Sequence, residues 1–142
     1  MSEEANKELV RRFFATLSSG DFAALSAFFD DRSTWGIGFA EDPSVRTGPQ
    51  EIVHDFLVPI REGLFEPANP KVAIVNLWAD GDWVIAETVG TGPMLNGNSY
   101  RNVYAFVLRV EGDVIREMRE YMDTAYAAKV SAGPIEGGSP VA

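Results

Sequence analysis

Residues 77–124 decide the fold, and they read LWADGDWVIAETVGTGPMLNGNSYRNVYAFVLRVEGDVIREMREYMDT. Gly81, Gly97 and Gly112 each follow an acidic or amide residue, at points where a tight reversal of the chain needs a positive φ angle. The runs between these turns are rich in Val, Ile, Trp, Tyr and Phe, which favour strands. The pattern predicts an antiparallel meander of four strands, over residues 71–79, 82–91, 99–110 and 113–123.

Successive side chains of a strand point to opposite faces of its sheet, so the apolar face of each strand can be predicted. In the second strand the odd positions are bulkier and more apolar, which predicts that Glu87 and Val89 face the core. In the fourth strand the even positions Met118 and Met122 are apolar, which predicts that Glu120 faces the core too. The sequence therefore places two carboxylates on the apolar side of one sheet.

Glu87 and Glu120 are the predicted catalytic residues. The strands that carry these two residues are separated by one other strand, so their backbones should lie about 10 Å apart and both side chains could reach one ligand. Two acids in an apolar pocket repel each other, which raises at least one pKa and provides a proton donor and an acceptor near neutral pH. The alternative is that each carboxylate accepts a structural hydrogen bond or pairs with an arginine.

Other residues are predicted to line a ligand pocket beside the two acids. Tyr100, Asn102 and Tyr104 share the inward face of the third strand, where they could hydrogen-bond a ligand or satisfy the acids. Trp35 could form the floor of the pocket or be plain core, and His54 could be catalytic or lie at the edge of a helix. The remaining ligand-binding candidates are apolar: Phe14, Ile37, Val89 and Met118.

Before the meander, apolar residues recur at helical spacing over residues 3–18, 22–29 and 48–62. Three helices followed by a meander predict an α+β fold, in which a cone-shaped, curved antiparallel sheet carries the helices on its concave face. An apolar cavity between the helices and the sheet is the expected ligand site. Residues 1–130 are predicted to form one domain, and residues 131–142 a flexible tail.

The composition of the chain limits the kinds of partner that it can bind. A net charge of −9 without clustered Lys or Arg argues against nucleic acid, and no apolar run is long enough to span a membrane. With one histidine and no cysteine among 142 residues, we expect no metal site, no other cofactor and a cytoplasmic location. The predicted outer face of the sheet has an apolar centre at Val84, Ala86 and Val103, which favours a homodimer through that face.

The order of these elements, the run Asn96-Gly97-Asn98-Ser99-Tyr100 and the residues from Glu111 to Asp123 resemble the SnoaL-like branch of the nuclear transport factor 2-like (cystatin-like) superfamily. The resemblance covers about Asn6 to Ala128. It implies a cone-shaped, commonly dimeric protein whose hydrophobic pocket serves isomerisation, aldol cyclisation, epoxide hydration or no chemistry at all.

The chain departs from two relatives in that superfamily. Limonene epoxide hydrolases have an arginine and two aspartates at the positions of Glu87, Val89 and Glu120, and a tyrosine and an asparagine at those of Trp35 and Ile37. Ketosteroid isomerases have an oxyanion-binding tyrosine at the position of Phe13 and a base aspartate near Ile37. By this resemblance Glu120 alone keeps a position typical of an acid/base carboxylate.

Three functions remain open at this stage. The first is cofactor-independent acid/base chemistry on a small apolar metabolite of terpenoid or polyketide type. The second is a ligand-binding or assembly module without catalysis, and the third is an epoxide hydrolase with altered machinery.

Overall fold

The structure, a computed structural model, describes residues 2–39 and 45–135. Its helical segments are α1 (Glu3–Ser19), α2 (Phe22–Ser26), η1 (Gln50–Leu57), α3 (Val58–Leu64) and α4 (Thr124–Ala132). Its strands are β1 (Thr34–Ile37), β2 (Arg46–Thr47), β3 (Lys71–Asp80), β4 (Trp83–Pro93), β5 (Ser99–Glu111) and β6 (Val114–Met122). The predicted meander is therefore confirmed as β3 to β6.

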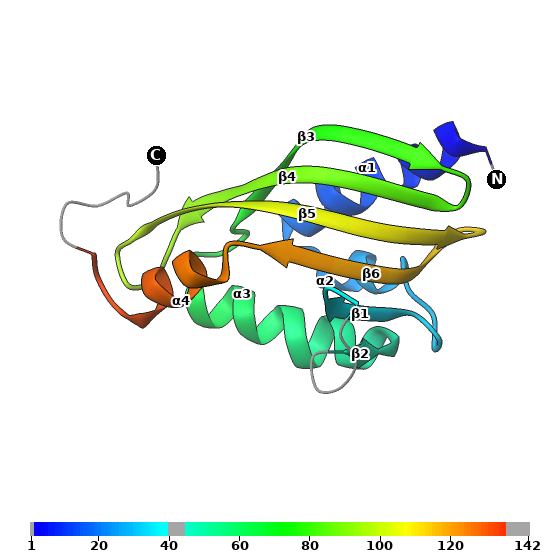
Figure 1. Cartoon of the computed structure of the whole chain (residues 1–142). Helices are drawn as coiled ribbons and strands as arrows, with labels where there is room; N and C mark the ends of the chain where they lie inside the picture. Colours follow the sequence, from blue (N-terminus) through cyan, green and yellow to red (C-terminus); the bar gives the residue numbers. More distant parts are fainter. Residues whose placement is uncertain (1, 40–44, 136–142) are drawn as a thin grey trace.

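Over the described ranges these strands form one six-stranded sheet in the order β2-β1-β6-β5-β4-β3. All neighbouring strands are antiparallel except β1 and β6, which are parallel. The helices α1, α2 and α3 lie along one side of the curved sheet (Figure 1). The predicted α+β fold, with helices packed on one face of the sheet, is confirmed.

The apolar core lies between α1, η1 and the inner face of the sheet. Phe13 and Phe14 of α1 are buried, and the Phe14 ring packs 5.0 Å from that of Phe106 on β5. Phe13 also contacts Trp35 of β1, at a ring separation of 6.1 Å. These aromatic contacts join the first helix to both halves of the sheet.

The third predicted helix differs in detail. It begins after Pro49 with the wide π-helical winding of η1, and it continues as α3, whose first turn contains Pro59. The backbone N–H of Val58 reaches the carbonyl of Val53, and proline, which has no N–H, follows directly where the winding changes. Thr47, which lies just before this helix, pairs with Thr34 in the sheet.

The predicted orientation of β4 is wrong. Val84 and Ala86 are fully buried, whereas Ile85 and Glu87 are exposed. The inner face of β4 lies under bulky partners, since Ala86 pairs with Phe106, and small side chains fit there. The larger apolar residues of β4 therefore occupy the outer face, contrary to the expectation that bulk marks the core.

A bulge sets the orientation of β6. Arg109 pairs with Glu117 and Val110 with Ile115, so β6 has one extra residue, Arg116, between these pairs. Both Ile115 and Arg116 are buried as a result. Beyond the bulge Glu120 faces inward, as predicted.

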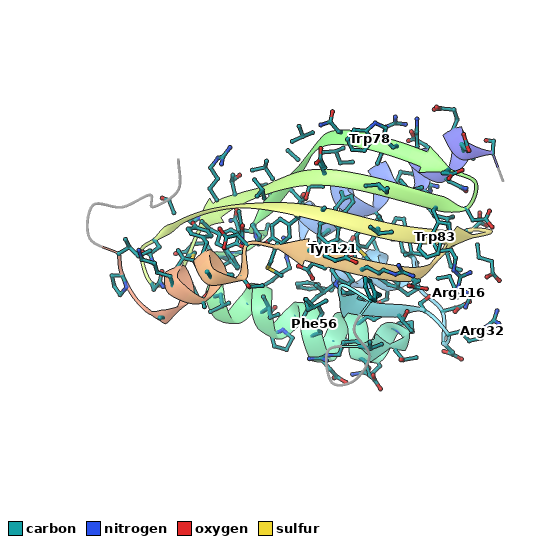
Figure 2. The ribbon with its side chains drawn as sticks, in the orientation of Figure 1. Arg32, Phe56, Trp78, Trp83, Arg116 and Tyr121 are labelled. Atoms are coloured by element: carbon teal, nitrogen blue, oxygen red, sulfur yellow. The ribbon has the colours of Figure 1, made fainter. Side chains whose placement is uncertain are left out.

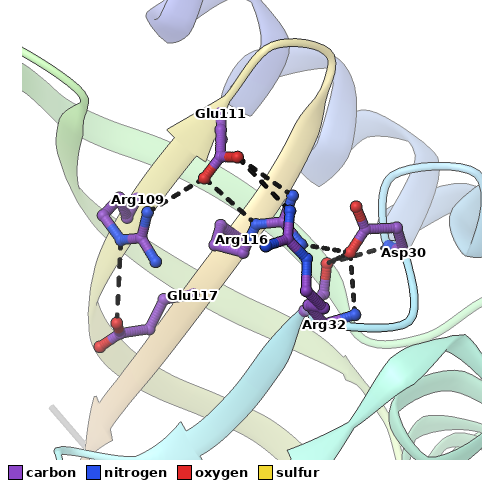
Figure 3. Close-up of polar contacts among 7 residues, drawn as sticks. Asp30, Arg32, Arg109, Glu111, Arg116 and Glu117 are labelled. Carbon is purple, nitrogen blue, oxygen red and sulfur yellow. Dashed lines mark hydrogen bonds and ion pairs between the residues drawn. The ribbon is translucent and has the colours of Figure 1, made fainter.

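Arg116 ties the loop after α2 to the end of the β5–β6 hairpin. Its guanidinium forms ion pairs with Asp30 and Glu111 (Figure 3). The backbone N–H of Arg32 and the Arg116 guanidinium hold the pKa of Asp30 below its ordinary value of 3.8. The start of β1 is thereby anchored beside β6.

At the C-terminal end, α4 begins at the cap Asp123 and runs to Ala132. The tail boundary predicted at 131 thus falls within this helix, and the backbone N–H of Ile135 donates to Asn98 Oδ1 at 2.8 Å. Residues 136–142 of the predicted tail lie outside the described residues.

The β4 register can be tested by an overpacking substitution. We expect Ala86→Leu to lower the free energy of unfolding by about 1–3 kcal/mol, because the added carbons have no room beside Phe106. The matched control Glu87→Gln on the outer face should change it by less than about 0.5 kcal/mol. Urea unfolding measures both, and equal effects would contradict the register.

Candidate functional site

A cavity of about 260 Å³ lies between the η1–α3 segment and the inner face of the sheet. Ile37 and Ile60 on its wall are each 38% exposed, so the cavity reaches the surface beside them. Its lining is mostly apolar: Leu17, Trp35, Ile37, Phe56, Leu57, Ile60, Leu64, Phe65, Pro70, Val72, Phe106, Met122 and Ala127, with the polar residues Arg61, Tyr100, Tyr104, Glu120 and Ser131. This is a small site for a mostly apolar ligand.

Glu120 provides a carboxylate in this apolar setting. The side chain is buried, and its Oε1 accepts a hydrogen bond of 2.9 Å from Trp35 Nε1. The parallel register pairs Trp35 with Met118 and Ile37 with Glu120, which brings the indole and the carboxylate together across the two strands. Trp35 therefore lines the cavity and also fixes the orientation of the acid.

Burial raises the pKa of Glu120 to about 7, although the Trp35 N–H favours the charged form and lowers it in part. Near neutral pH the carboxyl group is therefore present both as an acid and as a base. A group in that state can take up a proton and return it without a large free-energy cost in either direction.

Two tyrosines face the same cavity from β5. The hydroxyl groups of Tyr100 and Tyr104 are hydrogen-bonded to each other, and Asn102 Nδ2 donates to Tyr100 Oη at 3.0 Å. Burial raises the pKa of both phenols, and the nearby Glu120 contributes in the same direction. Both phenols therefore keep their protons at neutral pH and can act as hydrogen-bond donors.

Arg61 of α3 is the cation of the cavity lining. Its side chain is 6% exposed, and its Nη2 donates to the backbone carbonyl of Pro70 at 3.0 Å. Burial lowers its pKa to about 10, which still leaves the guanidinium charged at neutral pH.

The structure separates the two predicted acids. Glu87 is exposed on the outer face, where its Oε1 accepts a hydrogen bond of 3.0 Å from Asn76 Nδ2. Val89 lies on the same outer face, in the wall of a shallow hollow. The prediction that Glu87 and Glu120 share a pocket is wrong, because the β4 side chains alternate in the opposite sense.

The other predicted residues fall into two groups. Trp35, Ile37, Tyr100 and Tyr104 line the cavity. Four others lie outside the cavity lining: Phe14, Met118, His54 and Asn102. The first two are buried in the core, and His54 is exposed. Asn102 donates hydrogen bonds to the Tyr100 hydroxyl and to the backbone carbonyl of Asp123.

Sequence reasoning missed Arg61, although its spacing carries a signal. Leu57, Arg61 and Leu64 recur at intervals of four and three, so the arginine lies on the apolar stripe of its helix. A charged residue in such a stripe indicates a buried charge. Phe106 was also missed, although it follows Tyr104 at the spacing of one strand face.

Within residues 2–39 and 45–135, no three His, Asp or Glu side chains gather closely enough to hold a metal ion. None of the helices that these residues form is both long and apolar enough to cross a membrane.

Several solved structures share this architecture. An NTF2-like protein of unknown function from Burkholderia pseudomallei K96243 superposes with a TM-score of 0.78 at 18% identity, over 94% of this chain and 100% of that chain. A candidate SnoaL-like polyketide cyclase from Jannaschia sp. CCS1 gives 0.75 at 19% identity, over 94% and 95%. A protein with a ketosteroid isomerase-like fold from Catenulispora acidiphila DSM 44928, in complex with trimethylamine, gives 0.73 at 21% identity, over 89% and 94%.

These likenesses establish the fold. No curated protein matches the chain. The family model described as a SnoaL-like domain matches residues 10–118, which include α2, η1, α3, β3, β4 and β5 and reach Met118 of β6. The chain therefore belongs to the SnoaL-like domain family of the NTF2-like superfamily.

Proposed function

We propose that this protein binds a small, mostly apolar metabolite with a carbonyl group and transfers a proton on it by means of Glu120. One observation carries the proposal: a buried carboxylate with a pKa near 7 lines an apolar cavity. The candidate SnoaL-like polyketide cyclase from Jannaschia supports a substrate of polyketide type.

The residues of the cavity have distinct roles in this reaction. Ionised Glu120 takes a proton from the carbon beside the carbonyl, and the electron pair of the broken C–H bond moves to the carbonyl oxygen. In the isomerisation of a β,γ-unsaturated ketone, protonated Glu120 then returns the proton to the γ-carbon, while the carbonyl re-forms and the carbon–carbon double bond moves next to it. In a cyclisation the enolate carbon instead attacks a second carbonyl, whose oxygen receives the proton.

Tyr104 is the proposed hydrogen-bond donor to the enolate oxygen. Asn102 donates to Tyr100, so Tyr100 can donate its own proton to Tyr104, which leaves the Tyr104 proton for the ligand. Donors that are oriented before the reaction stabilise charge that develops on oxygen, and each contributes about 3–4 kcal/mol in well-studied oxyanion holes.

A second candidate function is ligand binding without catalysis. It is favoured by the location of Glu87 outside the cavity, which leaves Glu120 without the predicted partner acid. The same location, together with that of Val89, weakens the case for an altered epoxide hydrolase.

The outer sheet face is the proposed interface of a homodimer. Its exposed apolar side chains come from β3 to β6 and include Val75, Trp78, Ile85, Val103 and Tyr121. Trp78, Trp83 and Tyr121 mark this surface in Figure 2. A two-fold pairing would cover these side chains, and they replace the Val84 and Ala86 centre predicted from the sequence, which is buried.

Ionisation of Glu120 can be followed through Trp35. The chain has 3 tryptophans, so Trp78→Phe with Trp83→Phe leaves Trp35 as the fluorophore. We expect its emission to change as Glu120 loses its proton, with a midpoint at about pH 7. Adding Glu120→Gln should abolish this transition, and a transition that survives would contradict the assignment.

Proton transfer can be tested without knowledge of the natural substrate. With 2-tetralone, a small apolar ketone, in D₂O, we expect the protein to accelerate deuterium exchange beside the carbonyl, as measured by NMR. The rate should increase with pH and level off above about pH 7, because the base must be ionised. Glu120→Gln should reduce the acceleration by about 10²–10⁴-fold.

The matched control for this assay is Glu87→Gln, which alters the other predicted acid and should leave the rate unchanged. Equal acceleration by Glu120→Gln and the unmodified protein would refute the role of Glu120, and no acceleration by the unmodified protein would indicate the non-catalytic function.

The dimer is tested by sedimentation velocity. We expect Val103→Glu to raise the dimer dissociation constant at least about tenfold, because both copies bring a new charge to the same apolar interface. Leu95→Glu, at an exposed apolar residue of the β4–β5 turn, is the control and should leave it unchanged. A protein that sediments as a monomer before substitution would refute the interface.

A further inference from the structure

Arg61 is a buried cation whose hydrogen-bonding capacity is largely unused. Within the described residues its side chain makes one hydrogen bond, to the Pro70 carbonyl, and its buried Nε has no partner. No carboxylate of those residues lies within ion-pair distance of it. The arginine is therefore unlike Arg116, which is buried to a similar extent but paired with two acids.

Burying a guanidinium without a counter-ion costs free energy, because burial disfavours its charged form. The same effect lowers the pKa of Arg61 to about 10. Tyr104, the electrostatic neighbour that acts on Arg61, is an uncharged phenol at neutral pH and provides no counter-charge. An anion in the cavity would offset the cost, because a charged hydrogen bond is strongest where water is excluded.

We propose that the ligand of this cavity carries one carboxylate on an apolar skeleton, and that Arg61 binds that carboxylate. The proposal rests on the cavity being the ligand site of the proposed function, and it adds the chemical class of the ligand and the residue that selects it.

The lining of the cavity matches a carboxylate better than a phosphate. Arg61 is the one Lys or Arg that lines it in the described structure, and the side chains beside it on the helix, Leu57 and Leu64, are apolar. One guanidinium matches the single charge of a carboxylate and can bind both of its oxygens. A phosphate dianion would remain under-compensated among these apolar groups.

The positions of the two charged residues orient the ligand. Arg61 lies on α3 and Glu120 on β6, so they belong to the helical wall and the sheet wall of the cavity. With its carboxylate at Arg61, the ligand extends its apolar part toward Trp35 and Glu120. The binding end and the reacting end are therefore different parts of one molecule.

Calorimetry with two matched probes tests the proposal. The probes are 4-phenylbutanoate and its neutral amide, 4-phenylbutanamide, at pH 7. We expect the acid to bind at least about tenfold more tightly than the amide, as expected for a charge-assisted hydrogen bond. Arg61→Met should remove this preference by weakening binding of the acid, with little effect on the amide.

Further variants keep the outcome interpretable. Arg61→Gln removes the charge but retains a donor for the Pro70 carbonyl, so it replaces Arg61→Met if that variant does not fold. Arg61→Lys should restore part of the preference, and the exposed control Arg101→Met should retain all of it. Equal affinities for the two probes, absence of binding by the acid, or a preference that survives Arg61→Gln would each overturn the proposal.

The binding test is independent of catalysis. Glu120→Gln should keep the preference for the acid while it abolishes deuterium exchange. The binding affinities alone therefore test whether Arg61 binds the carboxylate of the ligand. The exchange rates alone test the proton-transfer function.

Discussion

Four residues of β1 pair in parallel with β6, and this pairing brings the Trp35 indole against the Glu120 carboxylate. The interaction depends on segments that are 85 positions apart in the chain. It is maintained by the Arg116 ion pairs at one end of β1 and by the aromatic packing of Phe13 on Trp35. Contacts from α1, the loop after α2 and the β5–β6 hairpin therefore fix the orientation of one buried acid.

The cavity beside this acid combines apolar walls with few polar groups. The apolar lining raises the pKa of Glu120, and the same lining leaves Arg61 without compensation. A single cause, exclusion of water, disfavours the charged form of both groups, which raises the pKa of the acid and lowers that of the arginine. The acid becomes partly neutral at physiological pH, whereas the guanidinium stays charged and has no counter-ion among the described residues.

The turn glycines and the alternating strands were sufficient to predict the meander, and the clean alternation at Met118 and Met122 was sufficient to predict that Glu120 faces inward. The same reasoning failed on β4, because both of its faces are apolar and hydrophobicity alone cannot distinguish a core face from an exposed one. Ala86 lies inside, where its partner on β5 is Phe106, whose ring packs against that of Phe14. Such a constraint depends on residues distant in sequence, and so does the pairing of β1 with β6.

The bulge between β5 and β6 has a consequence for the chemistry of the site. Ile115 anchors the start of β6 in the core, and uninterrupted alternation from it would turn Glu117, Arg119 and Tyr121 inward. The inserted Arg116 reverses that phase, so the strand can bury an aliphatic residue at its beginning and an ionisable one near its end. Deletion of one residue at this position would turn Glu120 outward and bring into the cavity a side chain that now faces outward, although Arg116 itself does not line the cavity.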